Sequence, residues 1–189
     1  MRSGETSQKL SEGGQRAQRI PVSSQSDRLK FNPQALYDAV DARRRELKMT
    51  WLELSRELHI STSTITRMTK RRWGIELDGV IGMARWVGRT VESFAGGDGG
   101  PPPEPTSVAR SGRFARFNTA ALYAAVNEER ERRAMTWDQV AAEVWPSGPW
   151  GASQLKGMAK GGRSDVYKAI AICGWLGTPI QSFVRESMS

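Results

Sequence analysis

Residues 51–70 read WLELSRELHISTSTITRMTK, and this stretch decides the fold of the first half of the chain. It begins with a helical pattern in which Ser55 is a small residue, placed where a second helix would cross the first. Four residues later stands His59, a residue type enriched at positive φ, where a tight turn needs left-handed backbone. The pattern therefore predicts two helices joined by a tight turn. The apolar residues that would close this pair are Leu54, Leu58, Ile60, Ile65 and Met68.

Capping signals predict the neighbouring helices. Asn32 precedes a proline, so it suits the cap of a first helix with proline at the first helical position. Thr50 and Glu53 form a capping-box pattern before the helix that starts at residue 51. Further helices are expected over residues 63–70 and 78–88. Because no segment shows sustained strand alternation, the predicted fold class is all-α.

The same signals recur 86 residues further along the chain. The pair Phe-Asn at 31–32 returns at 117–118, and Met-Thr-Trp at 49–51 returns at 135–137. Self-similarity at a fixed spacing indicates a duplicated structural unit, here one of about seventy residues. We therefore expect two small helical bundles of about five helices each, in tandem.

Composition supports this division. Residues 1–28 are rich in Ser, Gln, Gly and Arg, and are predicted to be a disordered basic tail. Residues 96–112 are rich in Gly and Pro and are predicted to be a flexible linker. The two modules would then occupy residues 29–95 and 113–189.

The chain's charge and residue counts narrow the function classes. A net charge of +8 favours an anionic partner. The first 30 residues contribute part of this excess, because they hold six basic and three acidic groups. One cysteine, Cys173, and one histidine cannot build a disulfide or a structural zinc site. Nucleophile-elbow, phosphate-loop and dinucleotide signatures are missing. We expect no enzyme activity, no cofactor and no bound metal. Without an apolar run of membrane-helix length or a signal peptide, a soluble cytoplasmic protein is expected.

The second module differs in its central turn. Trp137, Val140 and Ala141 repeat the first helix, and Ala141 occupies the small crossing position. The sequence WPSGPWGAS at 145–153 then replaces the tight turn and adds four residues. Its third helix is expected over residues 154–160, with altered docking geometry.

Residues 31–95 resemble the lambda-repressor/Cro-like helix-turn-helix regulators. The resemblance lies in the turn LELSRELHIS, the segment STITRM as recognition helix, and a fourth helix that ends in WVG, with His59 where glycine is usual. It implies a DNA-binding helix in the major groove. The recognition positions that it implies are Ser61, Thr62, Ser63, Thr66 and Arg67.

A group of cations follows this segment. Arg67 is the expected guanine reader, because its guanidinium can pair with both major-groove acceptors of that base. Lys70, Arg71 and Arg72 follow the recognition helix and are expected to contact DNA, the two arginines through phosphates. In the second module we expect weaker reading by Ser153, Gln154 and Lys156, with phosphate contacts from Lys160 and Arg163.

These patterns predict a transcriptional regulator that reads an asymmetric double-stranded DNA site with two tandem modules. A monomer with an internal pseudo-dimer is favoured, because 17 linker residues can span half-sites ~34 Å apart. One alternative is an adaptor in which the first module binds DNA and the second binds a protein partner through its WPSGPWG loop. Another is a helical structural or RNA-binding module, which lacks the aromatic strand platforms of common RNA readers.

Several residues have a simpler structural interpretation. The repeated tryptophans are expected to pack in the core, and Cys173 is expected to be buried. Trp150 has no counterpart and is left open between a groove contact and a lid over the core. The arginines at 43–45 are left open between a solvated face and phosphate contact. The four repeated tryptophans are Trp51, Trp86, Trp137 and Trp175.

Overall fold

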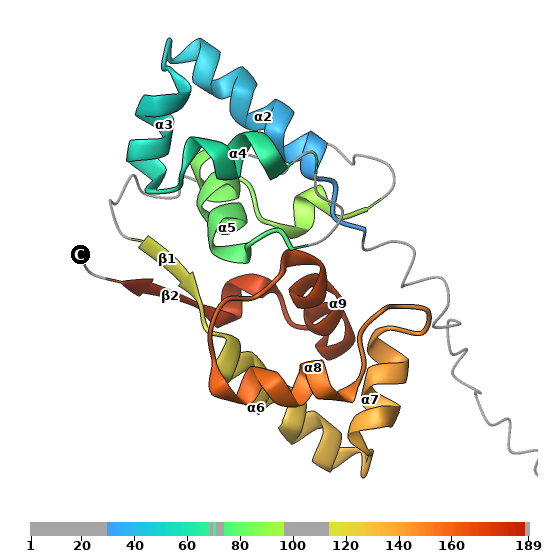
Figure 1. Cartoon of the computed structure of the whole chain (residues 1–189). Helices are drawn as coiled ribbons and strands as arrows, with labels where there is room; N and C mark the ends of the chain where they lie inside the picture. Colours follow the sequence, from blue (N-terminus) through green and yellow to red (C-terminus); the bar gives the residue numbers. More distant parts are fainter. Residues whose placement is uncertain (1–29, 69, 71–73, 97–113, 188–189) are drawn as a thin grey trace, which may run out of the picture.

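The computed structural model describes residues 30–68, 70, 74–96 and 114–187. This part of the chain is mostly helical, with eight α-helices and one short two-stranded sheet, so the all-α fold class is confirmed (Figure 1). The predicted disordered tail lies outside the described residues, and so does the predicted linker except for its first residue. Below, residues 30–96 are called repeat one and residues 114–187 repeat two.

Repeat one contains four α-helices and a short 3-10 helix. Asn32 caps the first of them, since its side chain accepts the N–H of Ala35 at 3.0 Å. Thr50 and Glu53 form the predicted capping box at the start of the second helix. The bounds are α2 Pro33–Glu46, α3 Trp51–Leu58, α4 Thr62–Met68, α5 Leu77–Trp86 and η1 Glu92–Phe94.

Repeat two follows the same order of helices, and Thr136 and Gln139 form the second predicted capping box. Its third helix has two parts, an α-helical one and a 3-10 one, where the sequence suggested a single helix. The bounds are α6 Thr119–Arg132, α7 Trp137–Val144, α8 Ala152–Gly157, η2 Met158–Lys160, α9 Val166–Leu176 and η3 Ile180–Phe183.

A short antiparallel sheet, which the sequence did not predict, closes repeat two. Strand β1 (Phe114–Phe117) pairs with β2 (Val184–Ser187), so the beginning and the end of the repeat lie side by side. Repeat one has the same junction in reduced form, because Phe31 and Ala95 form an isolated antiparallel bridge. Four residues per strand are too few for an alternating pattern to stand out in the sequence.

The predicted core residues of residues 51–70 are inside the protein. Leu54 and Ile65 have no exposed surface and Met68 is 2% exposed. Leu58 and Ile60 are half-buried and pack against this core. The predicted core pattern is therefore confirmed.

Two of the repeated tryptophans make matching aromatic stacks. Trp51 stacks on Tyr37 with ring centroids 5.2 Å apart, and Trp137 stacks on Tyr123 at 5.4 Å. All four repeated tryptophans are half-buried and pack against the core, so their predicted packing role is confirmed.

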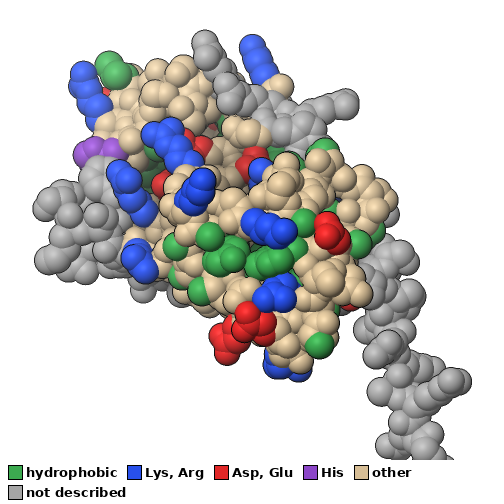
Figure 2. Space-filling model, turned by 60° about the horizontal axis from the view of Figure 1, so that its bottom comes forward, with side chains coloured by type: hydrophobic (Ala, Val, Ile, Leu, Met, Phe, Trp, Pro, Cys, Tyr) green, Lys and Arg blue, Asp and Glu red, His purple; other side chains and the backbone are tan. Residues whose placement is uncertain are grey.

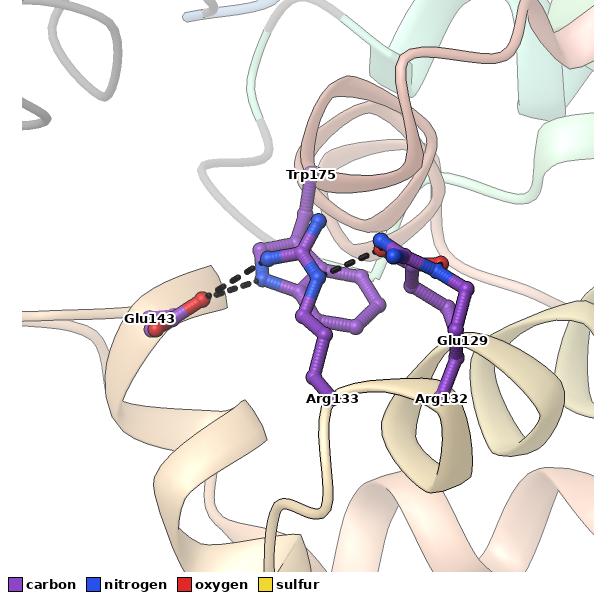
Figure 3. A network of polar contacts seen from close by, with 5 residues as sticks. All are labelled: Glu129, Arg132, Arg133, Glu143 and Trp175. Atoms are coloured by element: carbon purple, nitrogen blue, oxygen red, sulfur yellow. Dashed lines mark hydrogen bonds and ion pairs between the residues drawn. The ribbon is translucent and has the colours of Figure 1, made fainter. Parts of the chain in front are cut away.

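A polar network joins α6, α7 and α9 around Trp175 (Figure 3). The indole N–H of Trp175 donates to Glu143 at 2.8 Å, and the guanidinium of Arg133 lies 4.8 Å from the centroid of its ring. Arg133 also contacts Glu129, whose carboxylate pairs with Arg132 at 2.6 Å. The hydrogen bond from Arg132 is the main reason that the pKa of Glu129 is lowered to about 2.

The two repeats pack directly against each other. Helix α5 of repeat one contacts both β1 and α9 of repeat two, and the buried side chains form one continuous hydrophobic cluster. Figure 1 shows α3 and α7 at opposite ends of this pair of repeats. The two modules are thus in contact, which the expectation of two bundles on a flexible tether did not include.

Candidate nucleic-acid interface

The turn between α3 and α4 has the predicted geometry. Ser55 is only 8% exposed, and its hydroxyl donates to the carbonyl of Leu52 at 2.9 Å. His59 ends α3 in the left-handed region, with φ 52° and ψ 34°. Ile60 then donates its N–H to the carbonyl of Ser55 at 3.1 Å, which turns the chain back toward α4. The small crossing residue and the positive φ are both confirmed.

Hydroxyl groups gather at the first turn of α4. The hydroxyl of Ser61 accepts the N–H of Thr64 at 3.1 Å, so Ser61 is the cap of this helix. The same hydroxyl lies 3.0 Å from that of Ser63 and 2.7 Å from that of Thr64. Thr66 donates its hydroxyl to the carbonyl of Thr62 at 3.1 Å. Because each hydroxyl oxygen has two acceptor positions, these bonds orient the groups and leave acceptor capacity toward solvent.

Helix α4 has one buried face and one polar face. Ile65 and Met68 point into the core, whereas Ser61, Ser63 and Thr66 are exposed. Of the other recognition positions predicted here, Thr62 is half-buried, and the side chain of Arg67 lies outside the described part of the structure. Thr64, which is not among the recognition positions given above, is also exposed; its place three residues after a serine cap was the available signal.

The cations predicted after α4 are only partly described. Lys70 is exposed, close to the end of α4. Arg71 and Arg72 lie outside the described residues.

Aromatic packing replaces the tight turn in repeat two. Trp145 is 7% exposed, and the ring of Trp150 meets it edge to face at 5.4 Å. The loop is compact, because a Cβ at Gly148 would lie 2.8 Å from the Cβ of Trp145. The ammonium of Lys168 lies 5.3 Å from the centroid of the Trp150 ring. Of the two interpretations left open for Trp150, these contacts favour the lid over the core.

The residues expected to read DNA in repeat two are exposed on α8. Ser153, Gln154 and Lys156 all face solvent. The side-chain oxygen of Gln154 accepts the N–H of Gly151 at 3.0 Å and the hydroxyl of Ser153 at 2.8 Å. Gln154 therefore uses its acceptor to hold the start of α8 and keeps its amide N–H groups for other partners.

The two phosphate contacts expected in repeat two differ in their surroundings. Lys160 is exposed at the end of η2. Arg163 is also exposed, but its guanidinium forms an ion pair with Glu76 of repeat one at 3.2 Å. The structure therefore places Arg163 at the contact between the repeats, beside a carboxylate that no sequence motif had connected to it.

The arginines of α2 are largely engaged within repeat one. Arg44 lies 4.5 Å above the ring of Trp51 and pairs with Asp41 at 2.6 Å. Arg43 lies 5.3 Å from the centroid of the Trp86 ring. Arg45 is 74% exposed and shares Asp41 with Arg44. For Arg43 and Arg44, these contacts favour a structural role over phosphate contact.

Helices α4 and α8 lie on the same side of the protein. In Figure 1, α4 passes in front of α5, and α8 passes in front of α6. Figure 2 shows Lys and Arg side chains distributed over the face that comes forward from below, with hydrophobic side chains grouped at its centre. Figure 2 shows Asp and Glu side chains on the same face, so its positive charge is dispersed and not gathered into one patch.

Other kinds of site have little support in the described residues. There, no group of three or more His, Cys, Asp or Glu side chains is arranged to hold a metal ion. None of the described helices is long and apolar enough to cross a bilayer. Cys173 is buried as predicted, and burial raises the pKa of its thiol to about 12. Comparisons with protein-family models, curated proteins and solved structures return no match.

Proposed function

We propose that this chain is a double-stranded DNA-binding transcriptional regulator, in which α4 is the recognition helix of repeat one. The observation that carries the proposal is the connection from α3 to α4. A buried small residue at Ser55, left-handed backbone at His59 and a serine cap at Ser61 join two short helices through a tight turn, and we infer that this unit is a helix-turn-helix. Such a unit places the start of its second helix against base edges in the major groove.

The exposed side chains of α4 suit that role. Ser63, Thr64 and Thr66 present hydroxyl groups, which donate to and accept from base edges and phosphates. Arg67 lies one position after Thr66 on the same helix and would supply the bidentate contact to guanine. Lys156 and Lys160 would add phosphate contacts from repeat two, on the side of the protein where α8 lies.

The test is a selection of duplexes by the full chain, followed by fluorescence anisotropy at 50–200 mM salt. We expect a selected site whose affinity falls steeply with salt. Arg67→Ala should weaken the selected site by about tenfold to a hundredfold and relax the preference at one base pair.

Arg132→Ala is the matched control. It removes the same charge from an exposed side chain of α6 that pairs with Glu129, and should leave the affinity for the selected site unchanged. Failure to enrich any duplex over random sequence, or equal losses in both variants, would contradict the proposal.

The second candidate function is an adaptor in which repeat two binds a protein. The observation that favours it is the Trp145–Trp150 loop, which replaces the tight turn before α8. Lys156→Ala and Lys160→Ala decide between the two functions. If both leave the DNA affinity unchanged while Arg67→Ala weakens it as expected, repeat two does not bind DNA and the adaptor function is favoured.

A further inference from the structure

Equivalent residues of the two repeats pair with each other where the repeats meet. Glu76 and Asp165 form an antiparallel bridge. They occupy equivalent positions, since Trp86 and Trp175 follow them at the same distance, ten residues later. Leu77 donates its N–H to the carbonyl of Ser164 at 2.9 Å. Val166 donates to the carbonyl of Ile75 at 3.0 Å.

These two hydrogen bonds are each other's images. Residue 77 corresponds to 166 and residue 75 to 164, so exchanging the repeats turns one bond into the other. Suppose that residue i of one repeat contacts residue j of the other. If the equivalent of j in the first repeat also contacts the equivalent of i in the second, a two-fold axis relates the repeats. The repeats are therefore related locally by a two-fold rotation and not by a translation.

Side chains flank the bridge in the same reciprocal way. The carboxylate of Asp165 accepts the N–H of Gly74 at 2.7 Å. The carboxylate of Glu76 pairs with the guanidinium of Arg163 at 3.2 Å. Positions 74 and 163 are equivalent, as are 76 and 165, although one contact uses backbone and the other a side chain.

A second reciprocal pair lies further out. The ring of Phe31 meets that of Tyr167 edge to face at 5.9 Å. The N–H of Phe117 donates to the carboxylate of Asp78 at 2.8 Å. Phe31 corresponds to Phe117 and Asp78 to Tyr167, so both contacts join the same two positions with different chemistry. The repeats also meet where Ile180 donates its N–H to the carboxylate of Glu92 at 2.6 Å, a bond that is not part of this pattern.

We propose that this surface between the repeats, which we call the dyad surface, sets the DNA that the chain binds: two unlike half-sites in inverted orientation at one fixed spacing. The dyad surface consists of Phe31, residues 74–78, Phe117 and residues 163–167. The proposal rests on the proposed function, because it concerns the arrangement of the bases that α4 and α8 read.

The geometry separates this arrangement from that of two tethered modules. Modules on a free tether would bind direct and inverted half-sites alike and would tolerate several spacings. A two-fold pair presents α4 and α8 in opposite senses and therefore matches inverted half-sites, which two-fold helix-turn-helix proteins commonly read one helical turn or a multiple of it apart. The half-sites differ because α4 and α8 carry different side chains.

The DNA arm of the test compares inverted and direct arrangements of the two selected half-sites over a series of spacings. We expect one inverted spacing to bind about a hundredfold more tightly than all direct arrangements, since only there do both helices engage. Lengthening residues 97–113 by about ten Gly and Ser residues should leave the preferred spacing unchanged. A preferred spacing that changes with linker length, or equal binding of direct sites, would overturn the proposal.

The protein arm uses no DNA. Glu76→Cys with Asp165→Cys places two cysteines at a non-hydrogen-bonded antiparallel pair, where Cα atoms lie about 4.5 Å apart, within the range for a disulfide. We expect an intrachain cross-link under mild oxidation. The control pair Glu57→Cys with Glu143→Cys occupies equivalent positions on α3 and α7 and should not cross-link.

The two arms distinguish the two proposals. Absence of the 76–165 cross-link overturns the dyad surface whatever the DNA result. A cross-link in a protein that enriches no duplex leaves the dyad surface in place and overturns both the proposed function and the DNA arrangement drawn from it. A cross-linked protein that keeps the single inverted spacing supports both.

Discussion

The two repeats share their framework and differ in one connection. Both begin their second helix with a capping box and stack a tryptophan on a tyrosine of the preceding helix. Repeat one then turns at His59 with φ 52°, whereas repeat two continues from Trp145 with φ −135° into a longer loop. The third helix of a repeat can therefore be attached in two ways, by left-handed backbone or by an aromatic pair packed on the core.

The largest expected loss of stability comes from removing a ring of that aromatic pair, Trp145 and Trp150. Trp145→Ala should lower the free energy of unfolding by about 3 kcal/mol, because the ring is 7% exposed and its removal leaves a cavity under the loop. Urea denaturation measures this change. Trp150→Ala should cost less, since that ring is half-buried. Equal costs for the two variants would mean that Trp145 does not anchor the loop.

The small crossing residues should respond alike in the two repeats. Ser55 is 8% exposed and Ala141 is 6% exposed, so a larger side chain at either position forces the crossing helices apart. Ser55→Leu and Ala141→Leu should each destabilise by about 2 kcal/mol in the same denaturation assay. A tolerated change in repeat two alone would show that its longer loop has relaxed the helix crossing.

His59 provides a test with the opposite sign. His59→Gly should stabilise the protein by about 0.5 kcal/mol, because glycine adopts φ 52° without the Cβ penalty. His59→Ala should destabilise it, which makes the pair of variants a matched comparison. Melting temperatures are sufficient as the readout. If glycine fails to stabilise, contacts of the histidine side chain outweigh the strain of its backbone.

The smallest effect concerns pH. Glu129 has a pKa of about 2, below its ordinary 4.5, chiefly because Arg132 donates to its carboxylate. A lowered pKa gives stability that is present above pH 4.5 and lost as the pH falls toward 2. Glu129→Gln should remove this loss, measured as the change in melting temperature between pH 5 and pH 2. Repeat one has Arg43 at the equivalent position and lacks this contribution.

Local signals in the sequence predicted local structure well. The caps at Asn32 and Thr50, the left-handed turn at His59 and the packing of the repeated tryptophans each depend on residues close in the chain. The hydroxyl groups that gather at the start of α4 follow from the same local capping rules. These features were predictable because neighbouring residues determine them.

Contacts between distant residues were not predictable in the same way. Glu76 meets Asp165 in a bridge made by two backbone hydrogen bonds between their neighbours, which need no distinctive side chains. The pairing of β1 with β2 and the ion pair of Arg163 with Glu76 likewise join segments about seventy or more positions apart. The flexible linker was predicted from the composition of residues 96–112 alone. Composition does not indicate whether the two units that a linker joins pack against each other.

The antiparallel bridge also affects how DNA binding would depend on protein concentration. Two-fold pairs made of separate subunits assemble in a bimolecular step, so the paired fraction falls on dilution. Here both partners of the bridge belong to one polypeptide, and their pairing is a first-order event independent of protein concentration. On the proposed function, occupancy of a DNA site would rise in simple proportion to dilute protein, without the squared dependence that a dissociating dimer imposes.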